Sequence, residues 1–158
     1  QLKVAGHVLK SEIERFRREN QGPVLDITSR YFRELTLGSF ASLLTDENDQ
    51  GEPILVGTRS TGTRVLVERM SSGTRDQLYL ALRLASLEWR LARHEPMPFI
   101  LDDILVNADD ARSRAALKIL GELAAKTQII LFTHHRRIVE EAQQLATISG
   151  LHVHELGT

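Results

Sequence analysis

Three short segments of the chain carry side chains that could bind or cleave a phosphate group. The first is a pair of carboxylates, Asp102 and Asp103, which follow the apolar run Phe99–Leu101. Open α/β sheets bind ligands beyond the carboxyl ends of their strands, and a carboxylate placed there can hold Mg²⁺ through water. A second, adjacent carboxylate can orient a water for attack on a phosphate. An ordinary loop after a strand would also contain these residues.

The second segment is a run of small residues in front of a long apolar stretch: Ser71, Ser72, Gly73 and Thr74. Serine hydroxyls and the free N–H groups at a helix N-terminus form an anion site, and glycine lets another backbone or a ligand approach closely. Ser and Thr are also preferred N-cap residues for structural reasons alone. The loop by itself therefore fits either role.

The third segment is Thr133–His135, which follows the apolar run Gln128–Phe132. A histidine at the end of a strand can hydrogen-bond a phosphate oxygen or a reacting water. Taken alone, His134 also fits an exposed loop histidine.

Helices and strands that would position these segments follow from the spacing of apolar residues. Steps of three and four predict helices over 2–20 and from Pro23 to Gly38, with a break at Gly22–Pro23. Short β-like runs separated by polar turns then predict an antiparallel meander. Its strands are Phe40–Thr45, Pro53–Thr58 and Arg64–Arg69.

Beyond Met70 the pattern changes to alternating helices and strands, which predicts a parallel α/β sheet. The helix from Thr74 to about His94 is apolar almost all round, as is typical of a buried helix. Asp109 or Asp110 can cap the next helix. The remaining predicted elements are helices Ala111–Lys126 and Arg136–Ala146 and strands Phe99–Leu101, Gln128–Phe132 and Leu151–Leu156.

Composition limits the class of protein. With 158 residues, 42% hydrophobic and 26% charged, the chain suits one globular domain. A formal net charge of −1 predicts no general attraction to nucleic acid. The chain has no cysteine, which fits a reducing, cytoplasmic location. No apolar run reaches the roughly 18 residues of a membrane span, and no signal peptide is evident, so we expect no membrane partner. Because the chain starts at Gln1, we expect a piece of a longer protein.

Taken in order, these segments resemble the C-terminal half of an ABC-type ATPase head. The matching segments are Met70–Thr74 for the signature loop, Phe99–Asp103 for the Walker B strand, Asn107–Asp109 for the D-loop and Thr133–His134 for the switch-histidine loop. Ser71–Ala85 is most similar to the SMC-like and SbcC-like DNA-repair heads, nearest to the YhaN-like branch. The resemblance implies an α/β C-terminal lobe of a P-loop NTPase over 22–158, with a parallel sheet and a small antiparallel meander. Residues 1–21 would be the end of a coiled-coil arm.

In this family two heads sandwich two ATP molecules, and the resemblance assigns a role to each site residue. Ser71, Ser72, Gly73 and Thr74 would form the signature loop that contacts ATP on the other head, with Asn107 and Asp109 in the D-loop near the same nucleotide. Asp102 would hold Mg²⁺, Asp103 would orient the attacking water, and His134 would contact the γ-phosphate. ATP and Mg²⁺ are therefore the implied ligands.

Three departures from the family pattern bear on activity. Asp103 stands where the family usually has Glu, which shifts the carboxylate by roughly 1–1.5 Å. This predicts either slow hydrolysis or action of Asp103 through a second water. Ser72 replaces a signature glycine, and it fits if the backbone there needs no positive φ. No Gly-x-x-x-x-Gly-Lys-Ser/Thr loop is present, so we expect the chain alone to bind ATP poorly and not to hydrolyse it.

The implied partners are therefore an N-terminal lobe that carries the phosphate-binding loop and a second copy of the head. The resemblance adds a nuclease subunit and DNA. Two other functions remain open from the residues. One is a metal-dependent nuclease or phosphatase that uses Asp102, Asp103, Asp109 and His134. The other is a degenerate, non-catalytic dimerisation module.

Overall fold

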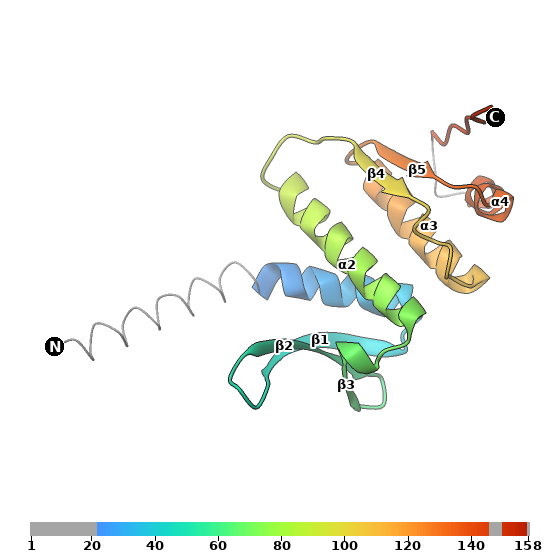
Figure 1. The fold of residues 1–158 in the computed structure, drawn as a ribbon. Coiled ribbons are helices and arrows are strands. Elements are labelled where there is room, and N and C mark those ends of the chain that lie inside the picture. Colours follow the sequence, from blue (N-terminus) through green and yellow to red (C-terminus); the bar gives the residue numbers. More distant parts are fainter. Residues whose placement is uncertain (1–21, 146–149, 158) are drawn as a thin grey trace.

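A helix and a small sheet form the N-terminal part of the fold in the computed structural model, which describes residues 22–145 and 150–157 (Figure 1). The helix covers residues 22–35, and Gly22 and Pro23 are both helical. It ends with Leu37 and Gly38 in the left-handed region, at φ of 53° and 78°. The Gly38 N–H donates to the Arg33 carbonyl at 2.8 Å, which closes the helix end. The predicted helix over 2–20 lies outside the described residues.

The predicted antiparallel meander is confirmed, with a shorter third strand. It consists of β1 (Phe40–Glu47), β2 (Pro53–Arg59) and β3 (Arg64–Leu66), in the order β1-β2-β3. The third strand was predicted to reach Arg69, but Val67–Arg69 form the 3₁₀ helix η1. The pairing of β2 with β3 ends at Val56 and Leu66, and the turn that follows carries Met70 into the core. A fully extended continuation would not make that turn.

Helix α2 (Ser72–Leu91) runs through the middle of the molecule (Figure 1). Helix 22–35 and the meander lie on one side of it, and the second sheet with its helices lies on the other. Leu78, Ala81 and Leu84 are almost completely buried. The prediction of a buried helix holds for one side of α2, whereas one stripe at helical spacing is exposed. Its members are Ser72, Asp76, Tyr79, Arg83, Ser86 and Arg90.

The second sheet is a parallel pair joined by a helical crossover, as predicted. Strand β4 (Phe99–Asp102) pairs in register with β5 (Ile129–Phe132), and α3 (Asp110–Ala124) connects them. Helix α4 (Arg136–Gln144) follows β5. The strand predicted over Leu151–Leu156 is wrong, since these residues have no regular structure and are exposed. A strand is stable only beside a hydrogen-bonded neighbour, and no described strand pairs with this segment.

Helix 22–35 is tied to α2 by a polar network as well as by the apolar core. Arg30 donates to the Glu88 carboxylate at 2.6 Å, and the hydroxyl of the buried Tyr31 donates to the same oxygen. Burial alone would raise the pKa of Glu88, but the hydrogen bonds from Tyr31 and Arg30 outweigh it and lower this pKa below its ordinary value. Burial and the hydrogen bond to Glu88 raise the pKa of Tyr31. Glu88 is therefore held in its charged form.

One face of the β4–β5 sheet is open to solvent. Leu101 points inward and is 1% exposed, whereas Ile100 and Phe132 on the opposite face are 56% and 43% exposed. The register aligns Ile100 with Ile130 and Asp102 with Phe132, so the exposed side chains share one face. We call Ile100, Ile130 and Phe132 the open sheet face. None of the described helices is long and apolar enough to cross a membrane.

Candidate functional site

The signature-like segment forms the first turn of α2. Ser71 is the N-cap, and its hydroxyl accepts a hydrogen bond from the Thr74 N–H at 3.3 Å and contacts the Thr74 hydroxyl at 2.8 Å. The capping role is thus confirmed. Ser72 is the first residue of α2 and is not among the described residues with positive φ, so the condition for replacing a glycine there is met. Ser71 and Ser72 are exposed, which leaves the N-terminus of α2 open to solvent.

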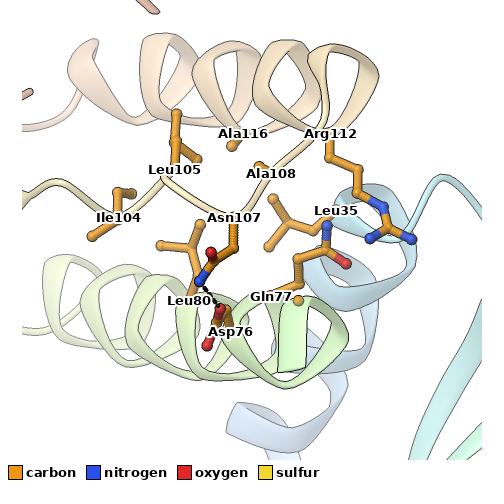
Figure 2. A pocket seen from close by; sticks show the side chains of 11 residues that line it. Leu35, Asp76, Gln77, Leu80, Ile104, Leu105, Asn107, Ala108, Arg112 and Ala116 are labelled. Atoms are coloured by element: carbon orange, nitrogen blue, oxygen red, sulfur yellow. Dashed lines mark hydrogen bonds between the residues drawn. The ribbon is translucent and has the colours of Figure 1, made fainter. Parts of the chain in front are cut away.

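The D-loop-like segment contacts the N-terminal part of α2 directly. The Asn107 amide donates to the Asp76 carboxylate at 3.0 Å, as the dashed line in Figure 2 shows. A Cβ added to Gly73 would lie 3.6 Å from the Asn107 carbonyl oxygen, which is ordinary contact. We call Gly73, Asp76 and Asn107 the signature–D-loop contact. It brings together two segments whose motifs are some 30 positions apart in the sequence.

A small cleft lies beside this contact, between α2 and the segment that leads into α3 (Figure 2). It has about 20 Å³ of space for water, which suits a single water molecule and excludes a nucleotide. Gln77 lines the cleft and is 7% exposed, and its Oε1 has no hydrogen-bond partner among the described residues. An ordered water in the cleft would satisfy this oxygen. The cleft therefore serves the packing of the segment rather than ligand binding.

Asp109 and Asp110 stabilise the start of α3. Asp109 is the N-cap, as the sequence allowed, and accepts from the Arg112 N–H at 2.9 Å. Arg112 also pairs with the Asp109 carboxylate at 3.4 Å. Asp110 forms an ion pair with Arg137 of α4. Both carboxylates are thus held by arginine side chains at the helix N-terminus.

Asp103 and His134 meet at the carboxyl ends of the two parallel strands. The His134 Nδ1 lies 2.8 Å from the Asp103 Oδ2, and the Thr133 hydroxyl donates to the Asp103 Oδ1 at 3.3 Å. The Asp103 N–H donates to the Phe132 carbonyl at 2.9 Å, which extends the strand pairing by one residue. Asp103 has a φ of 50°, in the left-handed region. Beyond the ends of β4 and β5, its backbone thus turns out of the sheet.

Asp102 ends β4, and its side chain is exposed. Within residues 22–145 and 150–157, no hydrogen bond or ion pair engages its carboxylate. This carboxylate is thus available to a cation. Among the described residues, the one group of acids and histidines within common metal-binding reach is Asp103, His134 and His135. The two-metal site considered for a nuclease included Asp102 and Asp109, and neither belongs to this group.

Sequence patterns did not point to Asp76 or Arg112, which hold the D-loop-like segment in place. Asp76 lies on the exposed stripe of α2 and reads as a solvated helix residue. Arg112 reads as a surface arginine of α3. Their partners depend on how α2 and α3 pack, and no local spacing carries that information.

Comparisons with known proteins agree with the fold. No protein-family model matches the chain. It is 31% identical over 138 residues to the uncharacterised protein YhaN of Bacillus subtilis, which covers 87% of this chain and 14% of that protein. It is 30% identical over 122 residues to the chromosome partition protein Smc of Methylococcus capsulatus, which covers 76% and 10%.

Solved structures give the same answer at the level of the fold. A structure of SMC ATPases, described together with their ATP-driven dimerisation and DNA-stimulated activation, superposes with a TM-score of 0.66 at 19% identity. That match covers 84% of this chain and 79% of the other. The Smc head domain of Pyrococcus furiosus, with an extended coiled coil and bound to the C-terminal domain of ScpA, gives 0.64 at 18% identity and covers 89% and 35%.

The structural matches define the class as the α/β lobe of an SMC head domain. Together with YhaN and Smc, they identify the chain as the C-terminal part of an SMC-like ATPase head, as the motifs predicted. The chain spans 14% and 10% of the lengths of these two relatives.

Proposed function

We propose that the chain completes an ATP-hydrolysing head in which ATP is held between two copies. The observation that carries this proposal is the pairing of Asp103 with His134 at the ends of β4 and β5, at 2.8 Å. An acid and a histidine from two different strands meet where an α/β sheet binds its ligand. Phosphoryl transfer depends mainly on positioned charge, which this pair supplies.

Asp102, Asp103 and His134 would act on the nucleotide bound to the same head. The free carboxylate of Asp102 fits Mg²⁺, which when bound neutralises charge on the phosphates. Asp103 accepts a hydrogen bond from the attacking water and so orients it. His134 directs Nδ1 to Asp103, and its Nε2–H can donate to a phosphate oxygen when the ring is protonated.

The signature loop and the D-loop would act on the nucleotide of the opposing head. Ser71 offers a hydroxyl, and the open N-terminus of α2 offers N–H groups and the positive end of the helix dipole. Gly73 leaves room for the γ-phosphate to approach the backbone. Because Asn107 is bonded to Asp76 within α2, the two loops would move as one unit when heads engage.

The open sheet face supports the N-terminal lobe with the phosphate-binding loop as the first partner. Ile100, Ile130 and Phe132 form an apolar surface that a sheet of this class normally covers. The relatives extend well beyond the chain and have room for such a lobe. A second copy of the head is the second partner. A cytoplasmic role in DNA repair or chromosome maintenance, with DNA and a nuclease subunit, rests on the resemblance.

Steady-state ATP turnover of the full-length protein that contains this chain tests the proposal. Asp103→Asn removes the water-orienting carboxylate, and we expect a loss of about 10²–10⁴-fold in rate. Ser71→Arg blocks the signature loop, and we expect a comparable loss. The wild-type rate should rise more than linearly with protein concentration, because two heads form each site.

Asp49→Asn and Ser60→Arg are matched controls, since both residues lie in turns of the meander. They should keep the wild-type rate. Turnover that survives both Asp103→Asn and Ser71→Arg would reject the assignment. A wild-type protein that binds ATP and dimerises without turnover would instead support the non-catalytic dimerisation module.

A further inference from the structure

A carboxylate and two imidazoles converge just beyond the ends of β4 and β5. The ligating atoms of Asp103, His134 and His135 all lie within 4.8 Å of one another. We propose that these three residues bind a divalent transition-metal ion, with Zn²⁺ as the ion that the ligand set fits best. This site is separate from the Mg²⁺ role proposed for Asp102.

The three ligands come from two strand ends, which fixes their relative positions. Asp103 directly follows β4, and the histidines lie in the loop between β5 and α4. The rings of His134 and His135 pack against each other with centroids 3.9 Å apart. Tetrahedral ligands of Zn²⁺ stand about 3.4 Å from each other, so atoms that lie within 4.8 Å need only a small approach to close the site.

His135 provides a second, independent indication of a ligand. Its Nε2 is shielded from solvent and has no hydrogen-bond partner within the described part of the chain. His135 is the N-cap residue of α4, but its side chain makes no capping hydrogen bond. Buried polar atoms are normally paired, so this shielded imidazole nitrogen calls for a partner. A metal ion bound by the three residues would supply one.

Thr133 contacts two of the three ligand residues, the carboxylate of Asp103 and the backbone N–H of His135. Its hydroxyl donates to the Asp103 Oδ1 at 3.3 Å and accepts from the His135 N–H at 3.1 Å. Metal ligands in proteins are commonly held by such outer hydrogen bonds, which fix the direction of the ligating atoms. The Oδ2 of Asp103 remains directed at His134. Thr133 is thus a positioning residue for the site.

The ligand types select the ion. Two imidazoles and one carboxylate suit Zn²⁺, whereas Mg²⁺ prefers oxygen ligands and keeps its waters. His134 is 72% exposed in its side chain, so an ion can enter from solvent. Three protein ligands leave a fourth position open to water. Asp103 and His134 could not act on ATP while they hold Zn²⁺. This consequence rests on the proposed function, whereas Zn²⁺ binding itself does not.

Calorimetric titration of the full chain with Zn²⁺, prepared without a polyhistidine tag, tests the site. We expect one ion per chain, retained in the presence of excess Mg²⁺. His135→Gln should weaken binding at least about tenfold, because it removes a ligand. Thr133→Val, which keeps all three ligands, should weaken binding by about 10–100-fold, and visible absorption of bound Co²⁺ should change with it.

His94→Gln is the matched control, since His94 is an exposed histidine after α2. It should bind Zn²⁺ as the wild type does. Circular dichroism of each variant checks that the fold is kept. Absence of stoichiometric Zn²⁺ binding in the wild type, or equal weakening by His94→Gln and His135→Gln, would overturn the proposal. ATP turnover measured with Mg²⁺ in buffer free of Zn²⁺ and other transition metals is independent of this result and tests the proposed function alone.

Discussion

The carboxylate of Asp103 is constrained by both its backbone and its neighbours. Its φ of 50° lies in a region where Asp and Asn are several-fold enriched over most other residues. Thr133 and His134 each hold one of its oxygens. A short carboxylate thus suits this backbone better than a longer one, which gives a structural reason for Asp103 in place of the Glu that the family usually has.

Glu88 makes stability depend on pH at the acid end. Its folded-state pKa is lowered, so its contribution is present above its unfolded-state pKa, about 4.3, and is lost as the pH falls through the folded-state value. We expect Glu88→Gln to lower the free energy of unfolding by about 1 kcal/mol at neutral pH. Urea unfolding from pH 7 down to about pH 3 should show this difference shrinking.

Glu122→Gln is the control for this pH series. Glu122 is 59% exposed and faces Lys118 at 4.0 Å, so its removal should change stability by less than about 0.5 kcal/mol at every pH. A difference between wild type and Glu88→Gln that stays constant through the acid range would contradict the coupling to Tyr31 and Arg30.

Gly73 and Gly57 should respond in opposite ways to substitution by alanine. At Gly73 a Cβ meets only ordinary contacts, so Gly73→Ala should keep or raise stability by up to about 0.5 kcal/mol. At Gly57 a Cβ would lie 2.6 Å from the Met70 side chain and 2.9 Å from Phe40, and we expect a loss of about 1–3 kcal/mol. Thermal unfolding of both variants measures these changes in stability.

ATP turnover of the full-length protein separates the role of Gly73 in the fold from its proposed role in the signature loop. Gly73→Ala should lower the rate by roughly a hundredfold while the fold is kept, because the added methyl group displaces the phosphate that approaches this turn. An unchanged rate would mean that Gly73 serves the fold alone.

Among the helices, the one over residues 22–35 has the least favourable end. Leu37 adopts φ of 53° and is 54% exposed, so it carries both a left-handed backbone and an apolar side chain in water. Leu37→Asn should raise the free energy of unfolding by roughly 0.5–1 kcal/mol, because Asn tolerates this conformation. Leu44→Asn, an exposed position on β1, is the control and should give no gain. Equal effects in chemical denaturation would show that φ is not the cause.

Elements with local signals were predictable from the sequence. Asp109 caps α3 as its residue type allowed, and Gly51 and Gly62 have φ of 74° and 84° in the turns that separate the meander strands. Contacts between distant positions were not predictable. Tyr31 meets Glu88 across 57 positions, and the pairing follows only from the packing of two helices.

In the site too, features with a local sequence signal were predictable and features that depend on packing were not. The loops that hold Asp103 and His134 could be predicted because apolar runs end there, and the parallel register of β4 and β5 brings these two loops together. The left-handed backbone of Asp103 and the shielded nitrogen of His135 carry no sequence signal. Leu151–Leu156 has the alternation of a strand, but a strand also needs a neighbour, which the pattern cannot supply.

At the scale of the whole molecule, the open sheet face is the surface most in need of a partner. Ile100 and Phe132 on β4 and β5 are exposed, whereas Tyr79 is the exposed large apolar side chain on α2. Apolar side chains on neighbouring strands form a continuous patch, and such patches promote association. The open sheet face is therefore expected to favour association with a partner.

Self-association of the isolated chain should depend on this face. Replacing Ile100 and Phe132 together by Thr keeps β-forming residues but removes the apolar surface, and sedimentation should shift towards the monomer. Tyr79→Thr, on the exposed stripe of α2, is the control and should leave association unchanged. If Tyr79→Thr shifted sedimentation instead, the surface responsible for self-association would lie on α2.

Glu88 ties the C-terminal part of α2 to helix 22–35, so a movement of that helix would be transmitted along α2. From Ser71 at its start to Glu88 near its end, α2 measures roughly 25 Å, and an α-helix of this length bends little. Arg30 and Tyr31 hydrogen-bond Glu88 near the C-terminus of α2. If α2 followed a rotation of helix 22–35 by about 5°, its N-terminus at Ser71 would move by on the order of 2 Å. A displacement of that size exceeds the roughly 1 Å misplacement that can cost an active site about a hundredfold in rate.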